Sequence, residues 1–202
     1  MATQFTALEI KSILSRYHPD IEPMPSRFKS ASVLIPFYDQ PEGLALVLMK
    51  RPDYQGAHGG QISFPGGARE QGDRNDKEVA LRETEEEYGI DQGTIEIWGR
   101  LKPQFTRVSG YWVSPFVGMI PCPAAFQPDP NEVERLIVVP FAHLLDPDHF
   151  RIGTYEWKGF QVPSYLYEFN GETIWGLTAR ILFNLITLIR TGKESDRQHP
   201  PT

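Results

Sequence analysis

Residues 66–90 read GGAREQGDRNDKEVALRETEEEYGI and lead from a pair of glycines into a short, strongly acidic helix. Asn75 or Asp76 is suited to the N-cap of this helix, because their side chains can accept hydrogen bonds from the first free backbone N–H groups. Gly89 stands where a left-handed C-cap is expected. The stretch therefore predicts a helix of about three turns.

Three carboxylates share one face of this helix. Glu83, Glu86 and Glu87 stand at positions i, i+3 and i+4, so that their side chains lie one turn apart. Like charges at this spacing repel each other, and a divalent cation between them would remove the repulsion. Ligands that are all oxygen favour Mg²⁺ or Mn²⁺. The alternative is that the acidic run is only a solvated helix face.

The surrounding residues resemble the signature of the Nudix hydrolases. The family pattern ends in Arg-Glu-apolar-any-Glu-Glu-any-Gly-apolar, and residues 82–90 match it throughout after Phe64-Pro65-Gly66-Gly67. Upstream, Gly67 is followed after five residues by Asp73, where the pattern has Glu, and eight residues rather than seven separate Asp73 from Arg82. This one-residue insertion resembles the branch of the family that cleaves coenzyme A.

A second motif of that branch is only partly present. The branch pattern reads roughly Leu-Leu-Thr-any-Arg, four residues, Arg, three residues, Gly, three residues, Phe-Pro-Gly-Gly. Arg51 and Gly60 fit this pattern, but Met49 replaces the threonine and Gly56 stands at the second arginine. Because a guanidinium is a strong phosphate ligand, its absence could weaken the contact with a 3′-phosphorylated ribose or shift the substrate. ADP-ribose, dinucleoside polyphosphates and nucleotide sugars therefore stay open as alternatives.

The resemblance implies an α+β fold, namely a Nudix-type α/β/α sandwich around a mixed β-sheet. It implies hydrolysis of a nucleoside diphosphate linked to another group, with coenzyme A or acyl-coenzyme A yielding 3′,5′-ADP and (acyl-)4′-phosphopantetheine. The implied metal ligands are Glu83, Glu87, Glu86 and a carbonyl at Gly67. Glu86 is expected to be the general base and Glu132 an alternative one, while Arg82 orients a carboxylate.

Residues expected to hold a small nucleotide substrate lie mainly in the loop before the helix. They are Arg51, His58, Gly66, Gly67 and Phe105. Arg51 can bind a phosphate, His58 could partly substitute for the missing arginine, and Phe105 could stack on an adenine. For His58 an ordinary surface role, and for Phe105 a place in the core, remain the competing interpretations.

Composition limits the other functional classes. The chain has 202 residues, a net charge of −6 and one cysteine, Cys122. The acidic balance argues against nonspecific nucleic-acid binding, and one cysteine forms no intramolecular disulfide. There is no apolar run long enough to cross a membrane and no signal peptide, so we expect a cytoplasmic protein. A non-catalytic nucleotide-binding module of the same fold is the alternative from another class.

We expect three parts along the chain: an N-terminal helix and linker over 1–28, the Nudix hydrolase domain over 29–192, and a disordered tail over 193–202. The first helix is predicted for 5–17 with Thr6 as N-cap, and it could dock on the domain or on a second subunit of a homodimer. Strands are predicted for 31–37, 44–49, 61–64, 94–102, 112–120 and 135–140. A hairpin around Asn170-Gly171 and an apolar helix to about Thr191 follow.

Overall fold

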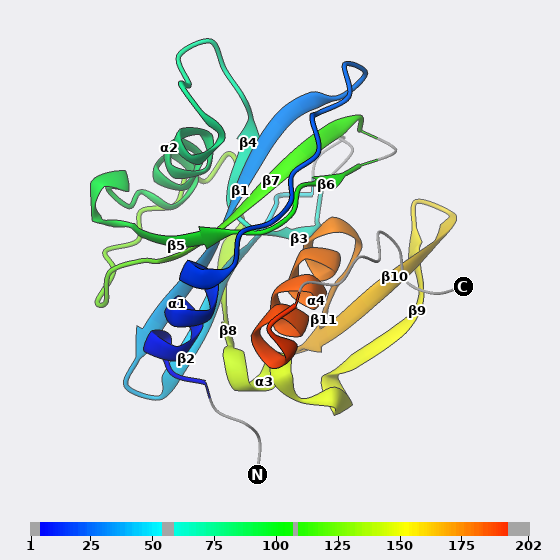
Figure 1. Ribbon diagram of the computed structural model, residues 1–202. Coiled ribbons are helices and arrows are strands. Elements are labelled where there is room, and N and C mark those ends of the chain that lie inside the picture. The colour runs from blue at the N-terminus through cyan, green and yellow to red at the C-terminus, as the bar shows by residue number, and fades with distance from the viewer. Residues whose placement is uncertain (1–4, 54–58, 107–108, 194–202) are drawn as a thin grey trace.

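The computed structural model describes residues 5–53, 59–106 and 109–193, in which strands and helices follow each other along the chain (Figure 1). The strands are β1 (Lys29–Gln40), β2 (Gly43–Lys50), β3 (Ile62–Ser63), β4 (Gly66–Ala68), β5 (Glu96–Arg100), β6 (Gln104–Phe105), β7 (Tyr111–Met119), β8 (Arg135–Pro140), β9 (Phe150–Trp157), β10 (Phe160–Phe169) and β11 (Glu172–Ile174). The helices are α1 (Ala7–Arg16), α2 (Asp76–Tyr88), α3 (Phe141–Leu145) and α4 (Gly176–Thr191). None of the helices in these ranges is long and apolar enough to span a membrane.

The larger sheet is mixed. Its strands follow the order β3-β2-β1-β7-β5, with β4 beside β1, β6 beside β7 and β8 beside β2. β1 and β7 run parallel, whereas the other neighbours are antiparallel. β4 pairs with the first half of β1, and α2 packs against both strands.

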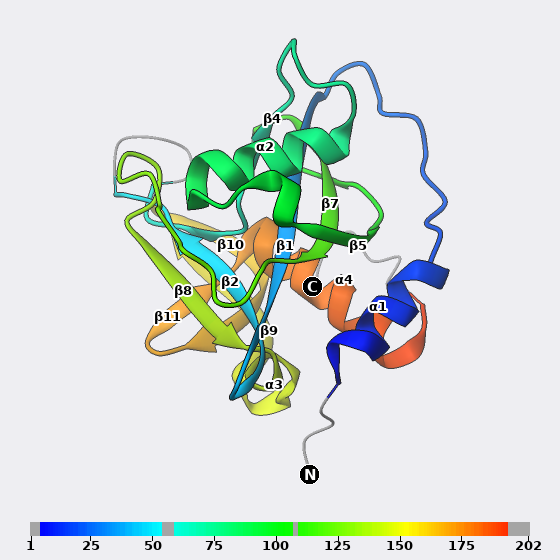
Figure 2. The ribbon, with the colours of Figure 1, turned by 90° about the vertical axis from the view of Figure 1, so that its left-hand side faces the viewer.

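Side chains of β1 alternate between two apolar cores. Leu34 belongs to the core under α2, whereas Ile35 and Phe37 belong to the core under α1 and α4. Successive side chains of a strand point to opposite faces, so one strand supplies both cores. Figures 1 and 2 show α2 on one side of the sheet and α1 with α4 on the other. The predicted sandwich, with the acidic helix and the C-terminal helix on opposite faces, is confirmed.

The ends of α2 also follow the prediction. Asn75 is the N-cap, and its side chain accepts a hydrogen bond from the Glu78 N–H. Gly89 has φ +67°, and its N–H donates to the Glu85 carbonyl at 2.8 Å. A left-handed residue closes the last turn without the steric cost that a side chain would bring. These two caps define which turn of α2 carries each glutamate.

The glycine pair forms strand β4 rather than a free turn. Gly66 and Gly67 pair with Val33 and Ser32 of β1. A Cβ on Gly66 would lie 2.3 Å from the Ser32 carbonyl oxygen, a distance that no real side chain tolerates. The predicted close approach of two backbones is therefore present, and it locks the loop before α2 onto the sheet.

A second sheet of β9, β10 and β11 covers the outer side of α4. The Tyr165 ring of β10 stacks on Phe183 of α4 with centroids 4.2 Å apart. Asn170 and Gly171 both have positive φ, as the predicted two-residue hairpin turn requires. The sequence analysis assigned no element to 146–163, where β9 and the first half of β10 lie. The predicted tail falls outside the described residues except for Lys193.

Candidate active site

Hydrogen bonds to the sheet hold α2 at both ends. The Asp76 carboxylate in the first turn accepts from the Ser114 hydroxyl at 2.8 Å and from the Ser30 hydroxyl at 3.4 Å. The buried Tyr88 hydroxyl in the last turn donates to the Val47 carbonyl at 3.0 Å. Because α2 cannot rotate about its axis without breaking these contacts, the glutamates between them have fixed directions.

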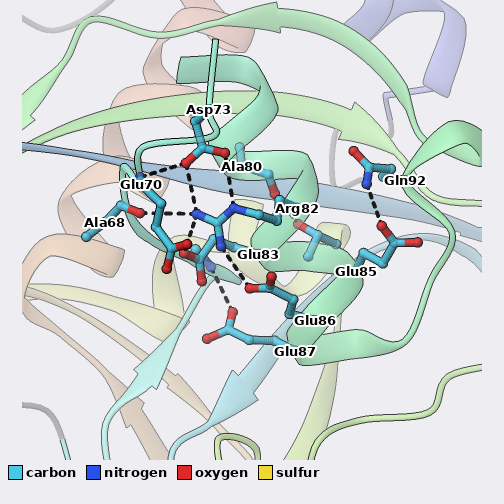
Figure 3. A network of polar contacts seen from close by, with 12 residues as sticks. Ala68, Glu70, Asp73, Ala80, Arg82, Glu83, Glu85, Glu86, Glu87 and Gln92 are labelled. Carbon is cyan, nitrogen blue, oxygen red and sulfur yellow. Dashed lines mark hydrogen bonds and ion pairs between the residues drawn. The ribbon is translucent and has the colours of Figure 1, made fainter. Parts of the chain in front are cut away.

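Arg82 lies at the centre of a cluster of carboxylates (Figure 3). Its guanidinium lies 3.1 Å from Asp73, 3.0 Å from Glu83 and 2.8 Å from Glu86, and it also donates to the Ala68 carbonyl at 3.2 Å. With one cation shared among three acids, the charge of each carboxylate is only partly balanced. Arg82 therefore orients two of the acidic side chains of α2, which is the role expected for it.

Asp73 anchors this arginine. Both of its carboxylate oxygens accept from the Arg82 guanidinium, and one also accepts from the Glu70 N–H at 2.7 Å. The Asp73 side chain is 5% exposed, and the hydrogen bonds from Arg82 hold its pKa below the usual value. Asp73, whose loop is one residue longer than in the family pattern, thus folds back onto α2. Although it replaces the glutamate of that pattern, it still provides an acidic partner for Arg82.

Glu87 is the most deeply buried acid of the site. Its side chain is 1% exposed, and its oxygens accept from the Arg51 guanidinium and from the Gly66 N–H, each at 2.8 Å. Burial raises the pKa of Glu87 to about 8, although Arg51 and the Gly66 N–H act in the opposite direction. The negative charges of Glu83 and Glu132 raise it further. A buried carboxylate held beside other carboxylates favours binding of an additional cation.

Glu83 lies against the backbone of β4. A Cβ on Gly67 would lie 2.4 Å from the Glu83 carboxylate, so any larger residue at 67 would take the place of that carboxylate. Burial raises the pKa of Glu83, and the charges of Glu86 and Glu132 act in the same direction, while Arg82 lowers it. The predicted pair of Gly67 and Glu83 is thus brought together by the fold.

Glu86 differs from its neighbours because it faces solvent. Its side chain is 55% exposed and has Arg82 as an ion-pair partner. Glu85, in contrast, points away from the cluster toward Gln92, as Figure 3 shows. The helix therefore presents Glu83, Glu86 and Glu87 to one side and excludes Glu85 from the site.

The loop before β8 brings Glu132 toward this face. Hydrogen bonds from the Gln127 N–H to the Tyr88 carbonyl and from the Asp129 N–H to the Glu87 carbonyl hold the loop at the end of α2. Glu132 is exposed, and its charge is close enough to raise the pKa of both Glu83 and Glu87. The structure therefore places Glu132 near Glu83 and Glu87, although at least 45 positions of sequence separate it from them.

The predicted substrate residues are distributed more widely. Arg51 contacts the Gly66 carbonyl at 3.3 Å as well as Glu87, so it belongs to the acidic cluster. Phe105 instead packs on Phe28 with ring centroids 5.7 Å apart, and its carbonyl accepts from Arg180. His58 lies outside the described residues, as does Gly56.

Two contacts of the site were missing from the sequence analysis. Arg51 was expected to bind a phosphate, and its ion pair with Glu87 was not anticipated. Glu172 of β11 contacts both Lys50 and Arg135, which joins the second sheet to the strands that end beside the site. Neither contact has a signal in local spacing, because the partners are 36 or more positions apart.

The donor set is suited to a hard divalent cation. Glu83, Glu86 and Glu87 offer carboxylate oxygens, and the site contains no sulfur ligand. Within the described ranges, no three acidic or histidine side chains converge as a complete metal cage. Arg51 holds an oxygen of Glu87, and Arg82 holds an oxygen of Glu86. The residues fit such an ion in their chemistry and burial.

Known proteins resemble this chain over most of its length. A model of the NUDIX domain matches residues 28–157. Nudix hydrolase 22, chloroplastic, from Arabidopsis thaliana is 34% identical over 180 residues, which cover 86% of this chain and 59% of that protein. The chain thus spans less than two thirds of that relative. The uncharacterized Nudix hydrolase NudL from Photorhabdus laumondii is 31% identical over 182 residues, covering 88% of this chain and 96% of that protein.

Two solved structures match this chain at lower identity. The NUDIX domain of Shewanella oneidensis NrtR, complexed with ADP ribose, is 18% identical with a TM-score of 0.46 and covers 66% of this chain and 84% of that chain. A MutT/nudix family protein from Enterococcus faecalis is 14% identical with a TM-score of 0.48, covering 94% and 76% of the two chains.

Proposed function

The chain belongs to the Nudix hydrolase family, and on that premise we propose that it hydrolyses the diphosphate of coenzyme A or of an acyl-coenzyme A to 3′,5′-ADP and (acyl-)4′-phosphopantetheine. The observation that carries the hydrolytic part of the proposal is the carboxylate face of α2, where Glu83 and Glu87 are largely buried against β4 beside Gly67 and Gly66. A merely solvated acidic face would not bury these two side chains. The choice of coenzyme A rests on the one-residue insertion before Arg82 and on Arg51 and Gly60.

Nudix hydrolases generally use divalent metal ions. In this chain Glu83, Glu87 and Glu86, with a backbone carbonyl at Gly67, would hold Mg²⁺ or Mn²⁺. Such an ion would neutralise the diphosphate and lower the pKa of the attacking water. The raised pKa of Glu87 and of Glu83 supports this assignment, because both acids are destabilised as anions until positive charge is added.

The protein's own groups supply proton transfer and orientation. Glu86 is the proposed general base, since it is the exposed member of the cluster and can reach a water molecule in the site. Arg82 holds Glu86 at 2.8 Å and Glu83 at 3.0 Å, and so fixes their directions. Glu132 is the alternative base, because it is exposed and lies near the same acids.

Substrate recognition is assigned to the loop that precedes α2. Arg51 already lies beside Gly66 and Glu87, where it could bind a phosphate oxygen of the substrate. Gly66 and Gly67 would allow the substrate to approach the backbone closely. Phe105, through the exposed part of its ring, and His58 complete the proposed set of substrate residues.

A second candidate substrate class follows from one residue. Gly56 replaces the second arginine of the coenzyme A motif, which favours ADP-ribose, a dinucleoside polyphosphate or a nucleotide sugar. All of these reactions would use the same acids. The two assignments therefore differ in the recognition loop and agree in the cleavage step.

The deciding experiment is hydrolysis of coenzyme A and of ADP-ribose, each with Mg²⁺ and with Mn²⁺, with products identified by mass. 3′,5′-ADP as the dominant product supports the coenzyme A assignment. Dominant AMP from ADP-ribose would overturn it and support the second class. Nucleotide binding without turnover of any member of the panel would instead identify a non-catalytic module.

A further inference from the structure

A basic hollow lies at the opposite end of α2 from the glutamates. It has a volume of about 310 Å³ and is lined by Arg69, Arg74, Asn75, Asp76, Lys77, Arg100 and Phe116. The four cations come from three parts of the chain, namely the residue after β4, the start of α2 and the end of β5. In a chain with a net charge of −6, four cationic side chains around one hollow form an uneven concentration of positive charge.

Two of the four cations, Arg69 and Arg74, are held by contacts within the protein, and the other two, Lys77 and Arg100, are available to a ligand. The Arg69 guanidinium donates to the carbonyls of Asp73 and Arg74 at 3.1 and 2.9 Å. Lys77 and Arg100 make no ion pair among the described residues, and Lys77 is exposed. A fixed guanidinium beside unpaired cations is the arrangement that recognises a phosphate group with several oxygens.

The nearby acids do not neutralise the hollow. Asp76 lies in it, but its carboxylate is bound to the hydroxyls of Ser114 and Ser30 and lies 3.8 Å from Arg69. Glu78 pairs with Arg74 outside the lining. Asp73 also lies near Arg69, whose charge lowers its pKa, but both of its oxygens accept hydrogen bonds from Arg82. Against four cations these three acids leave a surplus of one positive charge.

The side chains, rather than the end of α2, define this hollow. The Asn75 side chain already accepts the Glu78 N–H, so one of the free backbone donors of the first turn is used within the helix. The buried ring of Phe116 also lines the hollow. From Lys77 to Glu83, the nearest of the three glutamates of the site, the helix rises by about 9 Å at about 1.5 Å per residue.

We infer that the basic hollow is a second anion site, which binds the phosphate group of a small molecule independently of the metal site. Its volume accommodates a phosphate together with part of the molecule that carries it. The ligand is either free inorganic phosphate or a phosphomonoester of a nucleotide, since both present the same oxygens. Arg69 connects the hollow to the loop of Asp73, which in turn holds Arg82.

The test is an NMR titration of the full, metal-free chain, so that hydrolysis plays no part. At about 0.15 M NaCl, where the Debye length is about 8 Å, inorganic phosphate, 3′,5′-ADP and adenosine are added in separate experiments. We expect phosphate and 3′,5′-ADP to shift the amide signals of 69–77 and of Arg100, and adenosine to leave them unchanged. Tighter binding of 3′,5′-ADP than of phosphate would identify the nucleotide phosphomonoester as the source, and equal affinity would identify free phosphate.

Variants separate a built site from general attraction. Lys77→Gln with Arg100→Gln should weaken phosphate binding about tenfold, because two charge-assisted contacts are removed. Arg16→Gln with Lys193→Gln removes the same charge from α1 and from the end of α4, and should leave the affinity unchanged. Equal weakening by both pairs, shifts confined to Glu83–Glu87, or no shift with phosphate would overturn the inference. Unchanged coenzyme A hydrolysis in the Lys77 and Arg100 variant would show that the two sites act separately.

Discussion

Two arginine clusters flank the same helix, and the pKa of one acid in each, Asp73 and Glu87, is shifted in opposite directions. Arg82 is shared by Asp73, Glu83 and Glu86, and the pKa of Asp73 is lowered because hydrogen bonding from Arg82 exceeds the effect of burial. Arg51 faces Glu87, whose side chain is 1% exposed, and the pKa of that acid is raised because burial exceeds pairing. An ion pair alone therefore does not predict the direction of a pKa shift.

The difference gives the two clusters different roles. In the Arg82 cluster both oxygens of Asp73 accept hydrogen bonds from Arg82, which also holds Glu86, so this cluster serves to orient side chains. The Glu87 cluster keeps a carboxylate whose charged form is unfavourable until more positive charge arrives. Substitution of Glu87 should therefore act on hydrolysis first, whereas loss of the ion pair between Arg82 and Asp73 should act on stability first.

The largest effect is expected from Glu87→Gln. Loss of this carboxylate should reduce hydrolysis of the identified substrate by at least about a thousandfold, or about 4 kcal/mol in activation free energy, because the metal would lose a charged ligand. Glu83→Gln should also remove most of the activity. Steady-state rates with Mg²⁺ measure both. Glu85→Gln is the matched control, since Glu85 faces Gln92, and near-normal rates in either test variant would sink the metal assignment.

Arg82→Met should have the next largest effect, here on stability. It leaves Asp73, only 5% exposed, without its cationic partner, and such an unpaired buried charge costs about 3 kcal/mol of unfolding free energy. Urea unfolding measures the loss. Arg74→Met carries the same substitution at an 85% exposed side chain and should change stability by less than about 0.5 kcal/mol. Equal losses in the two variants would contradict the anchoring role of Arg82.

Adjacent glycines allow a sharper separation of stability from activity. Gly66→Ala should destabilise the fold by about 2 kcal/mol, because its Cβ would overlap the Ser32 carbonyl and the Val33 backbone. Gly67→Ala would displace only the end of the Glu83 side chain, so we expect about a tenfold lower rate with nearly unchanged stability. Thermal unfolding and rates on both variants test this pair.

Gly72→Ala serves as the control for both glycine variants. A Cβ at Gly72 would have nothing within 4 Å, so neither stability nor rate should change. Stability loss in the Gly67 variant equal to that in the Gly66 variant would show that Glu83 is part of the folding core rather than a displaceable ligand.

Local spacing in the sequence predicts the Arg82 side of the site well. Glu83 and Glu86 stand on one face of a helix whose caps, Asn75 and Gly89, are also visible in the sequence. Glu87 was also predicted as a member of this face, but its contact with Arg51 was not, because that contact joins residues 36 positions apart and depends on how β4 packs on β1. The burial of Glu87 also depends on how β4 packs on β1 and not on the local sequence. The adjacent Glu86, a glutamate of the same helix, is 55% exposed, whereas Glu87 is 1% exposed.

The same limit applies to the fold. Runs rich in apolar residues predicted β1, β2 and β7, and the two-residue turn at Asn170-Gly171 predicted the hairpin. β9 was not assigned because most of its side chains are half-buried or exposed, which gives little apolar periodicity. Strand β9 is held mainly by pairing with β10, a contact that a local pattern does not report.

The most direct comparison of the two clusters concerns pH. In metal-free protein the pKa of Glu87 is raised from 4.5 to about 8, so the folded state binds a proton more tightly than the unfolded state does. The resulting stability is fully present below about pH 4.5 and is lost as the pH rises toward 8. Asp73 acts in the opposite direction, because its lowered pKa gives stability that is present above its unfolded pKa and is lost in acid.

Urea unfolding at pH 5, 6.5 and 8 distinguishes these contributions, with each unit of pKa shift corresponding to about 1.4 kcal/mol. The unfolding free energy of the wild type, relative to Glu87→Gln, should fall by at least about 1 kcal/mol between pH 5 and 8, because the variant has no proton to lose at this position. Relative to Asp73→Asn, the wild type should show no such fall over the same interval, since Asp73 titrates at lower pH. A constant difference between wild type and Glu87→Gln would mean that Arg51 balances the buried charge after all, and the two clusters would then be alike.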